Sequence, residues 1–316
     1  MNVLAADKLD AIALKGLEAA GFSVAQCKGL APGSLPASAA TTEILIVRST
    51  PVTAGILPLF PALKLVVRAG AGTDTIDTAA AGARGIRVSN TPGKNADAVA
   101  ELALGLLLAA DRNLIAATAA LRQGLWSKGS LGQGMGLKGR TLGVVGFGAV
   151  GRAMALKAKG MGMDILAWSR SLTPQVSKNE GVGLAASLDE LARRSDAVSL
   201  HVASTGETRD LIGAAFFAAL RPNALFVNTS RGEVVDRNAL LAAIRSKGLR
   251  VGLDVFSGEP KVAEAPFADA ELASLSACTP HLGASTDQAA EAVAQEVVRI
   301  VLAFRETGLA PNSIRA

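Results

Sequence analysis

The chain alternates short runs of Val, Ile and Leu with longer segments of helical periodicity. Runs that are apolar throughout are typical of strands buried on both faces of a parallel sheet, and helices between such strands form β-α-β units. We therefore predict an α/β fold. The predicted strands of the first part are Val3–Ala5, Ile44–Val47, Leu63–Val67 and Ile86–Ser89. Those of the second part are Leu142–Val145, Asp164–Trp168, Ala197–Leu200, Leu225–Asn228, Val251–Val255 and Leu275–Thr279.

A long apolar helix separates the two series of strands. It follows the turn Thr91–Asn95, and Leu104 and Leu108 make even its second face apolar. Such a helix is buried on several sides, which suits a crossing between two domains. A chain of 316 residues is long enough for two domains. We predict two doubly wound parallel-sheet domains, Rossmann-like or flavodoxin-like, with the active site in the cleft: residues 1–95 plus 284–316, and residues 96–283.

A glycine-rich turn follows the first predicted strand of the second domain. Gly146, Gly148 and Gly151 have the spacing G-x-G-x-x-G and lead into a predicted helix, Arg152–Gly160. The first glycine permits a tight turn, the second lets the backbone approach a pyrophosphate, and the third lets the helix pack closely on the strand. The helix N-terminus offers N–H groups to phosphates. This context predicts a dinucleotide site, and the alternative is a glycine-rich turn without a ligand.

The end of the next strand bears on which dinucleotide is bound. Sites specific for NAD place Asp or Glu there, to accept hydrogen bonds from the ribose hydroxyls. Here the residues are Ser169 and Arg170. Without the carboxylate there is no repulsion against the 2′-phosphate of NADP, and Arg170 could pair with that phosphate. In the alternative, Ser169 bonds the ribose of NAD and Arg170 points to solvent, so both NAD and NADP are candidates.

Scarce residue types limit the chemistry. The chain has no Tyr and two His, His201 and His281, so few side chains can exchange a proton near neutral pH. The two cysteines, Cys27 and Cys278, lack ligand spacing, and we expect no metal site. A net charge of +5 without a basic run suits a small anionic ligand as well as nucleic acid.

The N-terminal segment and the most apolar segment bear on localisation. Charged residues appear as early as Asp7 and Lys8, so no signal peptide is expected. The stretch Ala98–Ala110 contains Glu101 and is too short to span a membrane. We therefore expect a cytoplasmic protein.

Three chemically distinct side chains follow three successive predicted strands: Arg231, Glu259 and His281. Because the carboxyl ends of parallel strands share one edge of the sheet, we expect these three to cluster. Hydride transfer with a 2-hydroxy acid requires a cation that binds the carboxylate, a His that exchanges the hydroxyl proton and an acid that holds the His. Asp254 also ends a strand and is expected near the nicotinamide. For His201 we favour a structural role or a place beside the cofactor.

Four stretches make the chain resemble the D-isomer-specific 2-hydroxyacid dehydrogenases over nearly its whole length, and within that family the phosphoglycerate dehydrogenases. They are Val47–Thr50, Val67–Gly72, Asn90–Asn95 and Pro280–Thr286. The resemblance implies that residues 1–95 plus 284–316 bind substrate, that 96–283 bind NAD or NADP, and that the chain forms a homodimer through the cofactor domain. Because this chain ends at Ala316, we expect the short form without the C-terminal regulatory domain of many phosphoglycerate dehydrogenases.

The resemblance also implies roles for individual residues. Arg231 binds the substrate carboxylate and carbonyl, His281 is the general acid/base, and Glu259 holds His281 and raises its pKa. The substrate-binding residues are Arg48, Arg68, Ala69, Gly70 and Asn95. The cofactor-binding residues are Gly146, Gly148, Ala149, Val150, Gly151, Ser169, Arg170, Thr229, Ser230, Asp254, Gly283 and Ala284.

The resemblance implies an NAD(P)-dependent D-2-hydroxyacid dehydrogenase, and we expect it to oxidise 3-phospho-D-glycerate to 3-phosphooxypyruvate, the first step of phosphorylated serine synthesis. The alternative, motivated by Ser169 and Arg170, is an NADPH-linked glyoxylate or hydroxypyruvate reductase with the same three catalytic residues. A non-catalytic dinucleotide sensor is disfavoured, because a pure sensor need not keep all three. The expected partners are a small phosphorylated anion and a second copy of the chain, and neither nucleic acid nor a membrane.

Overall fold

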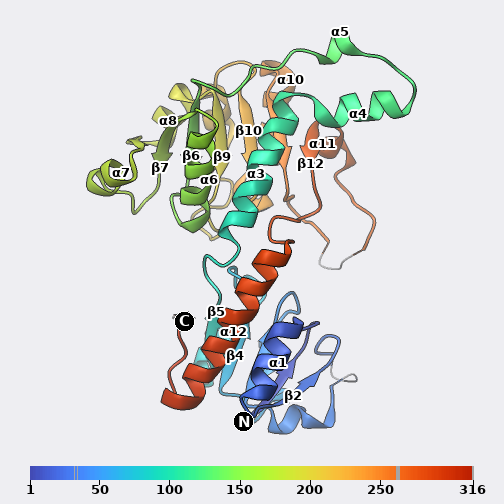
Figure 1. Ribbon diagram of the computed structural model, residues 1–316, viewed down its shortest axis with the longest axis vertical. Coiled ribbons are helices and arrows are strands. Elements are labelled where there is room, and N and C mark those ends of the chain that lie inside the picture. Colours follow the sequence, from blue (N-terminus) through green and yellow to red (C-terminus); the bar gives the residue numbers. More distant parts are fainter. Residues whose placement is uncertain (32, 34, 261–263, 315–316) are drawn as a thin grey trace. The chain divides into compact units, whose positions relative to one another are not determined.

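The computed structural model describes residues 1–31, 33, 35–260 and 264–314. The chain divides into two compact units (Figure 1). The first unit comprises Met1–Asn95 and Ser285–Ala316, and the second comprises Ala96–Ala284. Each unit contains one predominantly parallel sheet. The predicted α/β architecture with two parallel sheets is confirmed.

The sheet of the first unit has the strand order β13-β5-β4-β3-β1-β2, with β13 antiparallel to β5. Its strands are β1 (Asn2–Ala5), β2 (Ser23–Gln26), β3 (Ile44–Val47), β4 (Leu65–Arg68), β5 (Arg87–Asn90) and β13 (Ser313–Ile314). The sequence interpretation missed β2 and β13. Both are edge strands with partly exposed residues, so neither carries the continuous apolar run of a central strand.

Helices cover the first sheet. They are α1 (Ala11–Ala19), α2 (Thr78–Ala83), α12 (Asp287–Thr307) and the short 3-10 helices η2 (Ala37–Thr41) and η3 (Leu57–Leu59). The apolar side chains of α1 and α12, such as Leu17 and Ile300, form one core with Ile44 and Ile46. The intervening residue Leu45 points to the opposite core, as the alternation of side chains along a strand requires. The C-terminal helix therefore completes the unit that the N-terminal residues begin.

A buried carboxylate ties the C-terminal segment to the rest of this unit. Glu296 of α12 is 6% exposed and accepts two hydrogen bonds from Arg299, at 2.9 and 2.5 Å. It also accepts one from Asn312 and lies 3.5 Å from the ammonium of Lys94. The Arg299 guanidinium lowers the pKa of Glu296 to about 2. The ionised carboxylate thus joins three stretches of chain.

The sheet of the second unit is parallel throughout, in the order β12-β11-β10-β9-β6-β7-β8. Its strands are β6 (Thr141–Val145), β7 (Asp164–Trp168), β8 (Gly183–Leu184), β9 (Ala197–Leu200), β10 (Leu225–Asn228), β11 (Arg250–Leu253) and β12 (Ser276–Cys278). The chain runs outward from β6 to β8 and then returns to the other side of β6 with β9. Such a reversal of direction is where α/β sheets bind ligands, at the carboxyl ends of the strands.

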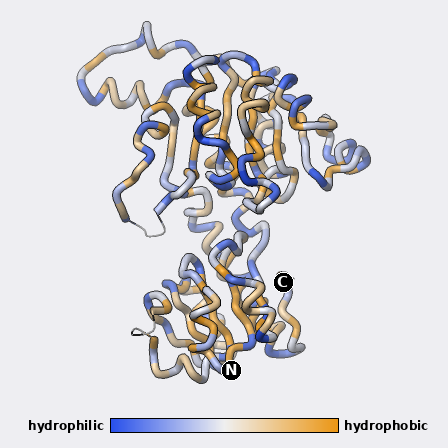
Figure 2. Tube along the Cα trace, turned by 180° about the vertical axis from the view of Figure 1, so that it is seen from behind, coloured by the Kyte–Doolittle hydropathy of each residue, from blue (hydrophilic) through white to orange (hydrophobic). Residues whose placement is uncertain are grey.

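Two layers of helices enclose this sheet, and Figure 2 shows the hydrophobic residues gathered in its strands. The helices of the second unit are α3 (Ala96–Asp111), α4 (Leu114–Arg122), α5 (Lys128–Leu131), α6 (Ala149–Gly160), α7 (Pro174–Glu180), α8 (Leu188–Arg194), α9 (Ala214–Ala219), η4 (Gly232–Val234), α10 (Arg237–Lys247) and α11 (Ala270–Ser274), of which α4 and α5 lie outside the layers. Residues of α3 and α6 pack on one face, with Leu107 and Met154 buried. Residues of α8, α9 and α10 pack on the other. Glu101 of α3 pairs with Lys157 of α6.

Two features of the helices depart from a plain layered domain. The helix α4 has no buried residue, and α4 and α5 extend from the body of the second unit (Figure 1).

Among the described residues no single helix is long and apolar enough to cross a membrane. Only α3 and α4 taken together, with a bend of 65° between them, reach the length and apolar composition of a membrane span among the described residues.

Replacing Glu296 should weaken the first unit in a pH-dependent way. We expect Glu296→Gln to lower the free energy of unfolding at pH 7 by about 2 kcal/mol, because the ion pair and one acceptor are lost. The native carboxylate has the lower pKa, so its stabilisation is present above the unfolded-state pKa and is lost as the pH falls towards 2. Urea unfolding at pH 7 and pH 3 measures this. Glu291→Gln, on the exposed side of α12, is the control, and an equal loss in both variants would contradict the assignment.

Candidate active site

Arg231, Glu259 and His281 follow β10, β11 and β12, which are neighbours in the second sheet. All three strands are parallel, so their carboxyl ends lie at one edge. All three residues belong to the second unit. The structure therefore brings the three predicted catalytic side chains to the same edge of one sheet.

The imidazole of His281 is hydrogen-bonded to the carboxylate of Glu259. The distance from Nδ1 to Oε1 is 2.5 Å. This bond raises the pKa of His281 above its ordinary value, while loss of hydration and the nearby Arg231 guanidinium act in the opposite direction. With Nδ1 bonded to Glu259, the second ring nitrogen, Nε2, is the atom through which His281 can give or take a proton.

The loop that carries His281 is organised by a buried carboxylate, Asp254. Its side-chain oxygens accept hydrogen bonds from the hydroxyl of Thr279 and from the backbone N–H groups of Leu282 and Gly283, at 2.6 to 2.8 Å. Its backbone carbonyl accepts the N–H of His281. Burial raises the pKa of Asp254, although these hydrogen bonds oppose the shift. The position of Asp254 near the nicotinamide stays a prediction, and the structure shows that its side chain shapes this loop.

His281 has a left-handed backbone conformation, with φ of +56°. A residue other than glycine rarely adopts this conformation unless its surroundings impose it. Here the backbone N–H is bonded to Asp254 and the ring is bonded to Glu259. These two bonds fix the direction of the imidazole.

The loop of Arg231 is shaped by a buried amide. Asn228, which is 1% exposed, accepts hydrogen bonds from both the N–H and the hydroxyl of Ser230 and donates one to the carbonyl of Arg231. The next residue, Gly232, lies so close to the following loop that an added Cβ would fall 2.1 Å from the carbonyl carbon of Phe256. The Arg231 loop is therefore packed against the segment that leads to Glu259. Sequence reasoning missed Asn228, because an Asn that ends a strand carries no signal of its own.

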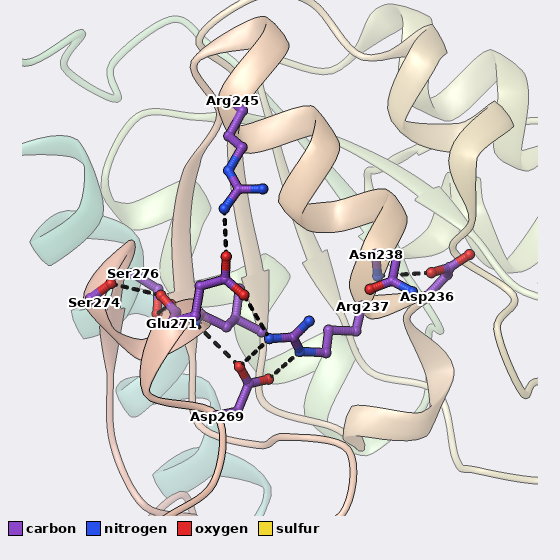
Figure 3. Close-up of polar contacts among 9 residues, drawn as sticks. Asp236, Arg237, Asn238, Arg245, Asp269, Glu271, Ser274 and Ser276 are labelled. Atoms are coloured by element: carbon purple, nitrogen blue, oxygen red, sulfur yellow. Dashed lines mark hydrogen bonds and ion pairs between the residues drawn. The ribbon is translucent and has the colours of Figure 1, made fainter.

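Downstream of these loops, an ion-pair network joins α10 to α11 (Figure 3). The guanidinium of Arg237 forms two 2.6 Å hydrogen bonds to Asp269 and one to Glu271, which also accepts from Arg245. Asp269 caps α11 by accepting the N–H of Leu272. Arg237 opens the helix that follows the Arg231 loop, so the network anchors the chain on both sides of the Glu259 loop.

The predicted phosphate-binding turn lies between β6 and α6. Gly146 has φ of +93°, and a Cβ there would fall 2.5 Å from the carbonyl oxygen of His201. A Cβ at Gly151 would fall 2.0 Å from the carbonyl oxygen of Gly146. At Gly148 an added Cβ would meet no atom within 4 Å, and no side chain caps α6 at this residue. The turn thus combines two glycines required by packing with one open backbone position at a helix N-terminus, which fits a pyrophosphate.

Two buried polar atoms near the same edge have no hydrogen-bond partner among the described residues. They are Nδ1 of His201, after β9, and Oγ1 of Thr229, after β10. Nε2 of His201 is paired with the hydroxyl of Ser199, and burial lowers the pKa of His201 to about 3, so the ring is neutral. Buried polar groups normally have a partner. These two atoms therefore fit contacts with a polar ligand, as predicted for Thr229.

The residues at the end of β7 form their own contacts. The hydroxyl of Ser169 lies 3.4 Å from that of Ser171. The guanidinium of Arg170 forms an ion pair with Glu207, in the loop after β9. Arg170, for which pairing with a 2′-phosphate was one of the two alternatives, therefore has a protein partner in Glu207.

The predicted substrate-binding residues lie in the first unit. Asp7 accepts the backbone N–H groups of Arg48, Ser49 and Thr50 through one carboxylate oxygen, and so holds the loop after β3. In the sequence, Asp7 stands out only as an early charged residue. Arg68 ends β4, and its guanidinium lies over Gly70, where a Cβ would fall 1.4 Å from Nη1. Asn95 is the last residue of the first segment of this unit.

Residues 104–283 match the family model described as D-isomer specific 2-hydroxyacid dehydrogenase, NAD binding domain. The chain therefore belongs to the D-isomer-specific 2-hydroxyacid dehydrogenase family, as the sequence motifs predicted. It is an NAD(P)-dependent oxidoreductase with an NAD-binding domain.

Two relatives show the breadth of the family around this chain. A glyoxylate reductase from Thermococcus litoralis is 41% identical over 261 residues, which are 80% of this chain and 77% of the relative. A D-3-phosphoglycerate dehydrogenase from Methanocaldococcus jannaschii is 37% identical over 309 residues, which are 95% of this chain and 57% of the relative. The chain thus spans little more than half the length of this second relative. Enzymes named for two different substrates are similar to it at comparable identity.

Solved structures agree with the observed fold. An NADPH-dependent glyoxylate/hydroxypyruvate reductase from Sinorhizobium meliloti, in complex with NADP and malonate, has a TM-score of 0.84 and 28% identity, and the match covers 99% of this chain and 96% of that one. An NAD⁺-bound 3-phosphoglycerate dehydrogenase from Entamoeba histolytica has a TM-score of 0.80 and 26% identity, covering 100% and 99%. The two structures hold different dinucleotides on the same fold.

The bond between Glu259 and His281 should set the pH dependence of turnover. We expect Glu259→Gln to lower the pKa of His281, because the neutral amide no longer favours the imidazolium. Reduction of a 2-oxo acid needs protonated His281, so the alkaline limb of the pH profile for reduction should move to lower pH. Oxidation needs neutral His281, so its acidic limb should also move to lower pH.

Rate profiles of kcat/KM in both directions measure the shift. Asp189→Asn, at an exposed carboxylate of α8 that is paired with Arg193, is the control. A profile for Glu259→Gln that keeps the wild-type limbs would show that the carboxylate does not control the histidine.

Proposed function

We propose that this dehydrogenase oxidises 3-phospho-D-glycerate to 3-phosphooxypyruvate with NAD or NADP. The observation that carries the proposal is the hydrogen bond between Glu259 and His281 beside Arg231. A raised histidine pKa next to a guanidinium suits removal of a hydroxyl proton from a bound 2-hydroxy acid. The dinucleotide, when bound, accepts the hydride.

In this proposal the three side chains have separate tasks. Arg231 binds the carboxylate of the substrate and polarises its C2 oxygen. His281 accepts the hydroxyl proton at Nε2 as C2 is oxidised, and returns a proton in the reverse direction. Glu259 keeps the imidazole oriented through Nδ1 and stabilises its protonated form.

The positions of Arg48 and Arg68 favour a substrate that carries a second anionic group. Arg48 follows β3 and Arg68 ends β4, and these strands are neighbours in the first sheet. Adjacent parallel strands bring both to the same sheet edge, together with the backbone at Ala69 and Gly70. Two guanidinium groups there would bind the phosphate of a phosphorylated hydroxy acid, and glyoxylate has no such group.

For the cofactor we propose that the pyrophosphate binds at Gly148 and Ala149, that Thr229 donates to the dinucleotide, and that the adenosine ribose lies at Ser169 and Arg170. The open backbone position at Gly148 and the unpartnered hydroxyl of Thr229 support this placement. The second candidate function, an NADPH-linked glyoxylate or hydroxypyruvate reductase, is favoured by the presence of Ser169 in place of an acid and by the named relatives.

Rates with defined substrates test both functions. We expect measurable oxidation of 3-phospho-D-glycerate and reduction of 3-phosphooxypyruvate, with kcat/KM at least about tenfold above that for hydroxypyruvate or glyoxylate, since hydrogen bonds to a charged group contribute about 1.5 to 3 kcal/mol. Each substrate is assayed with NADH and with NADPH. A higher kcat/KM for glyoxylate or hydroxypyruvate would replace the first function by the second.

Loss of His281 should lower turnover strongly and spare cofactor binding. His281→Asn is the suitable variant, because Asn tolerates the left-handed backbone at this position. We expect kcat to fall by about 10²- to 10⁴-fold with an unchanged Kd for the dinucleotide. Near-normal turnover would refute the assignment of the proton to His281.

We further propose that the chain forms a homodimer through α4 and the segment after it. Leu114, Ile115 and Leu121 of α4 are 49 to 58% exposed, and Leu125 and Trp126 are 54% and 81% exposed. An apolar surface of this kind, on a helix that has no buried residue in the described part of the chain, is typical of a subunit interface.

Changing this surface should alter the state of assembly. We expect the double variant Leu121→Glu with Trp126→Glu to sediment as a monomer at micromolar concentration while the wild type sediments as a dimer. Analytical ultracentrifugation measures both. Leu156→Glu, at a 72% exposed leucine of α6, is the control, and a dimer that survives the double substitution would contradict this interface.

A further inference from the structure

The ion pair between Arg170 and Glu207 joins the two strands that flank the phosphate-binding turn. Arg170 follows β7 and Glu207 lies in the loop after β9. In the sheet, β6 lies between β7 and β9, and the glycine turn starts at the carboxyl end of β6. The pair therefore links the loops on either side of the proposed dinucleotide site.

Glu207 projects from an ordered turn. The hydroxyl of Thr208 accepts the N–H of Thr205 and donates to the carbonyl of Ala203, both at 2.7 Å. The N–H groups of Thr208 and Arg209 both donate to the carbonyl of Thr205. Thr208 is only 7% exposed. The backbone on both sides of Glu207 is thus fixed, and the carboxylate is held within reach of Arg170.

The ion pair is exposed, so another anion can replace Glu207 as the partner of Arg170. The side chains of Arg170 and Glu207 are 67% and 77% exposed, and ion pairs at such positions are weak. A phosphate monoester carries more negative charge than a carboxylate and matches the planar guanidinium equally well. A 2′-phosphate could take Arg170 from Glu207, but it would then lie close to the displaced carboxylate.

We propose that Glu207 is a cofactor-specificity residue of this enzyme. It supplies, from the loop after β9, the negative charge that NAD-specific sites carry at the end of the second strand and that Ser169 lacks. Its carboxylate opposes the 2′-phosphate of NADP(H) by occupying Arg170 and by direct repulsion, and it leaves the 2′-hydroxyl of NAD(H) unopposed. This inference rests on the proposed position of the adenosine ribose at Ser169 and Arg170.

Binding of two nucleotide fragments to the whole protein tests the proposal. The fragments 2′,5′-ADP and 5′-AMP differ by the 2′-phosphate alone, and isothermal titration calorimetry reports their Kd without any turnover. We expect Glu207→Gln to bind 2′,5′-ADP about three- to tenfold more tightly and to leave 5′-AMP within about twofold, because one competing and repelling charge is removed. The ratio of kcat/KM for NADPH to that for NADH should rise by a similar factor.

Asp189→Asn is the matched control. Asp189 is an exposed carboxylate of the same unit, paired with Arg193 on α8, so its replacement removes the same charge elsewhere. We expect it to bind both fragments as the wild type does. If both variants bound 2′,5′-ADP more tightly by the same factor, the change in net charge would explain the effect of Glu207→Gln. This result would overturn the proposal.

Arg170→Ala separates this inference from the proposed cofactor site. If Arg170→Ala weakens 2′,5′-ADP but Glu207→Gln binds it like the wild type, the role of Glu207 is overturned and the ribose site stands. If Arg170→Ala changes neither fragment, the proposed ribose site is wrong and the role of Glu207 falls with it. The expected result is a loss in Arg170→Ala and a smaller gain from Glu207→Gln in that background than in the wild type.

Discussion

The candidate active site depends on the buried carboxylate of Asp254. Its three side-chain hydrogen bonds, to Thr279, Leu282 and Gly283, satisfy two backbone N–H groups that have no strand to pair with. Each such donor, left without a partner, costs about 1 to 3 kcal/mol. The same residue accepts the backbone N–H of His281 and donates its own N–H to Asn228. Without the hydrogen bonds of Asp254, the loop would impose neither the left-handed conformation of His281 nor its bond to Glu259.

Much of this arrangement is visible in the sequence. The apolar runs locate the central strands β3, β9 and β10, because burial on both faces leaves few polar positions in them, such as Ser199 in β9 and Asn228 at the end of β10. The order of the strands then places Arg231, Glu259 and His281 at one edge. The glycine spacing at residues 146–151 predicts a turn that the structure shows to be enforced by contacts at Gly146 and Gly151.

Other parts depend on contacts between residues distant in sequence. Asp7 holds the loop of Arg48 from 41 residues away, and Asn312 reaches Glu296 across a turn. Nothing in the local pattern around Asp7 or Glu207 distinguishes these carboxylates from ordinary surface charges. The edge strands β2 and β13 lack a continuous apolar signal because one side of each faces solvent. Sequence patterns indicate which residues are buried. The roles of Asp7 and Asn312 and the edge strands depend instead on hydrogen bonds between residues that are distant in sequence.

The distribution of residues between the two units has an evolutionary consequence. Arg231, Glu259 and His281 belong to the second unit, whereas Arg48 and Arg68 belong to the first. With the roles proposed for these residues, substitutions in the first unit would change which acid is accepted while the proton-transfer groups and their supporting loops stay intact. Selection could then act on substrate range and on proton chemistry almost independently. Divergence of this kind would produce relatives that share one catalytic apparatus and carry names taken from different substrates.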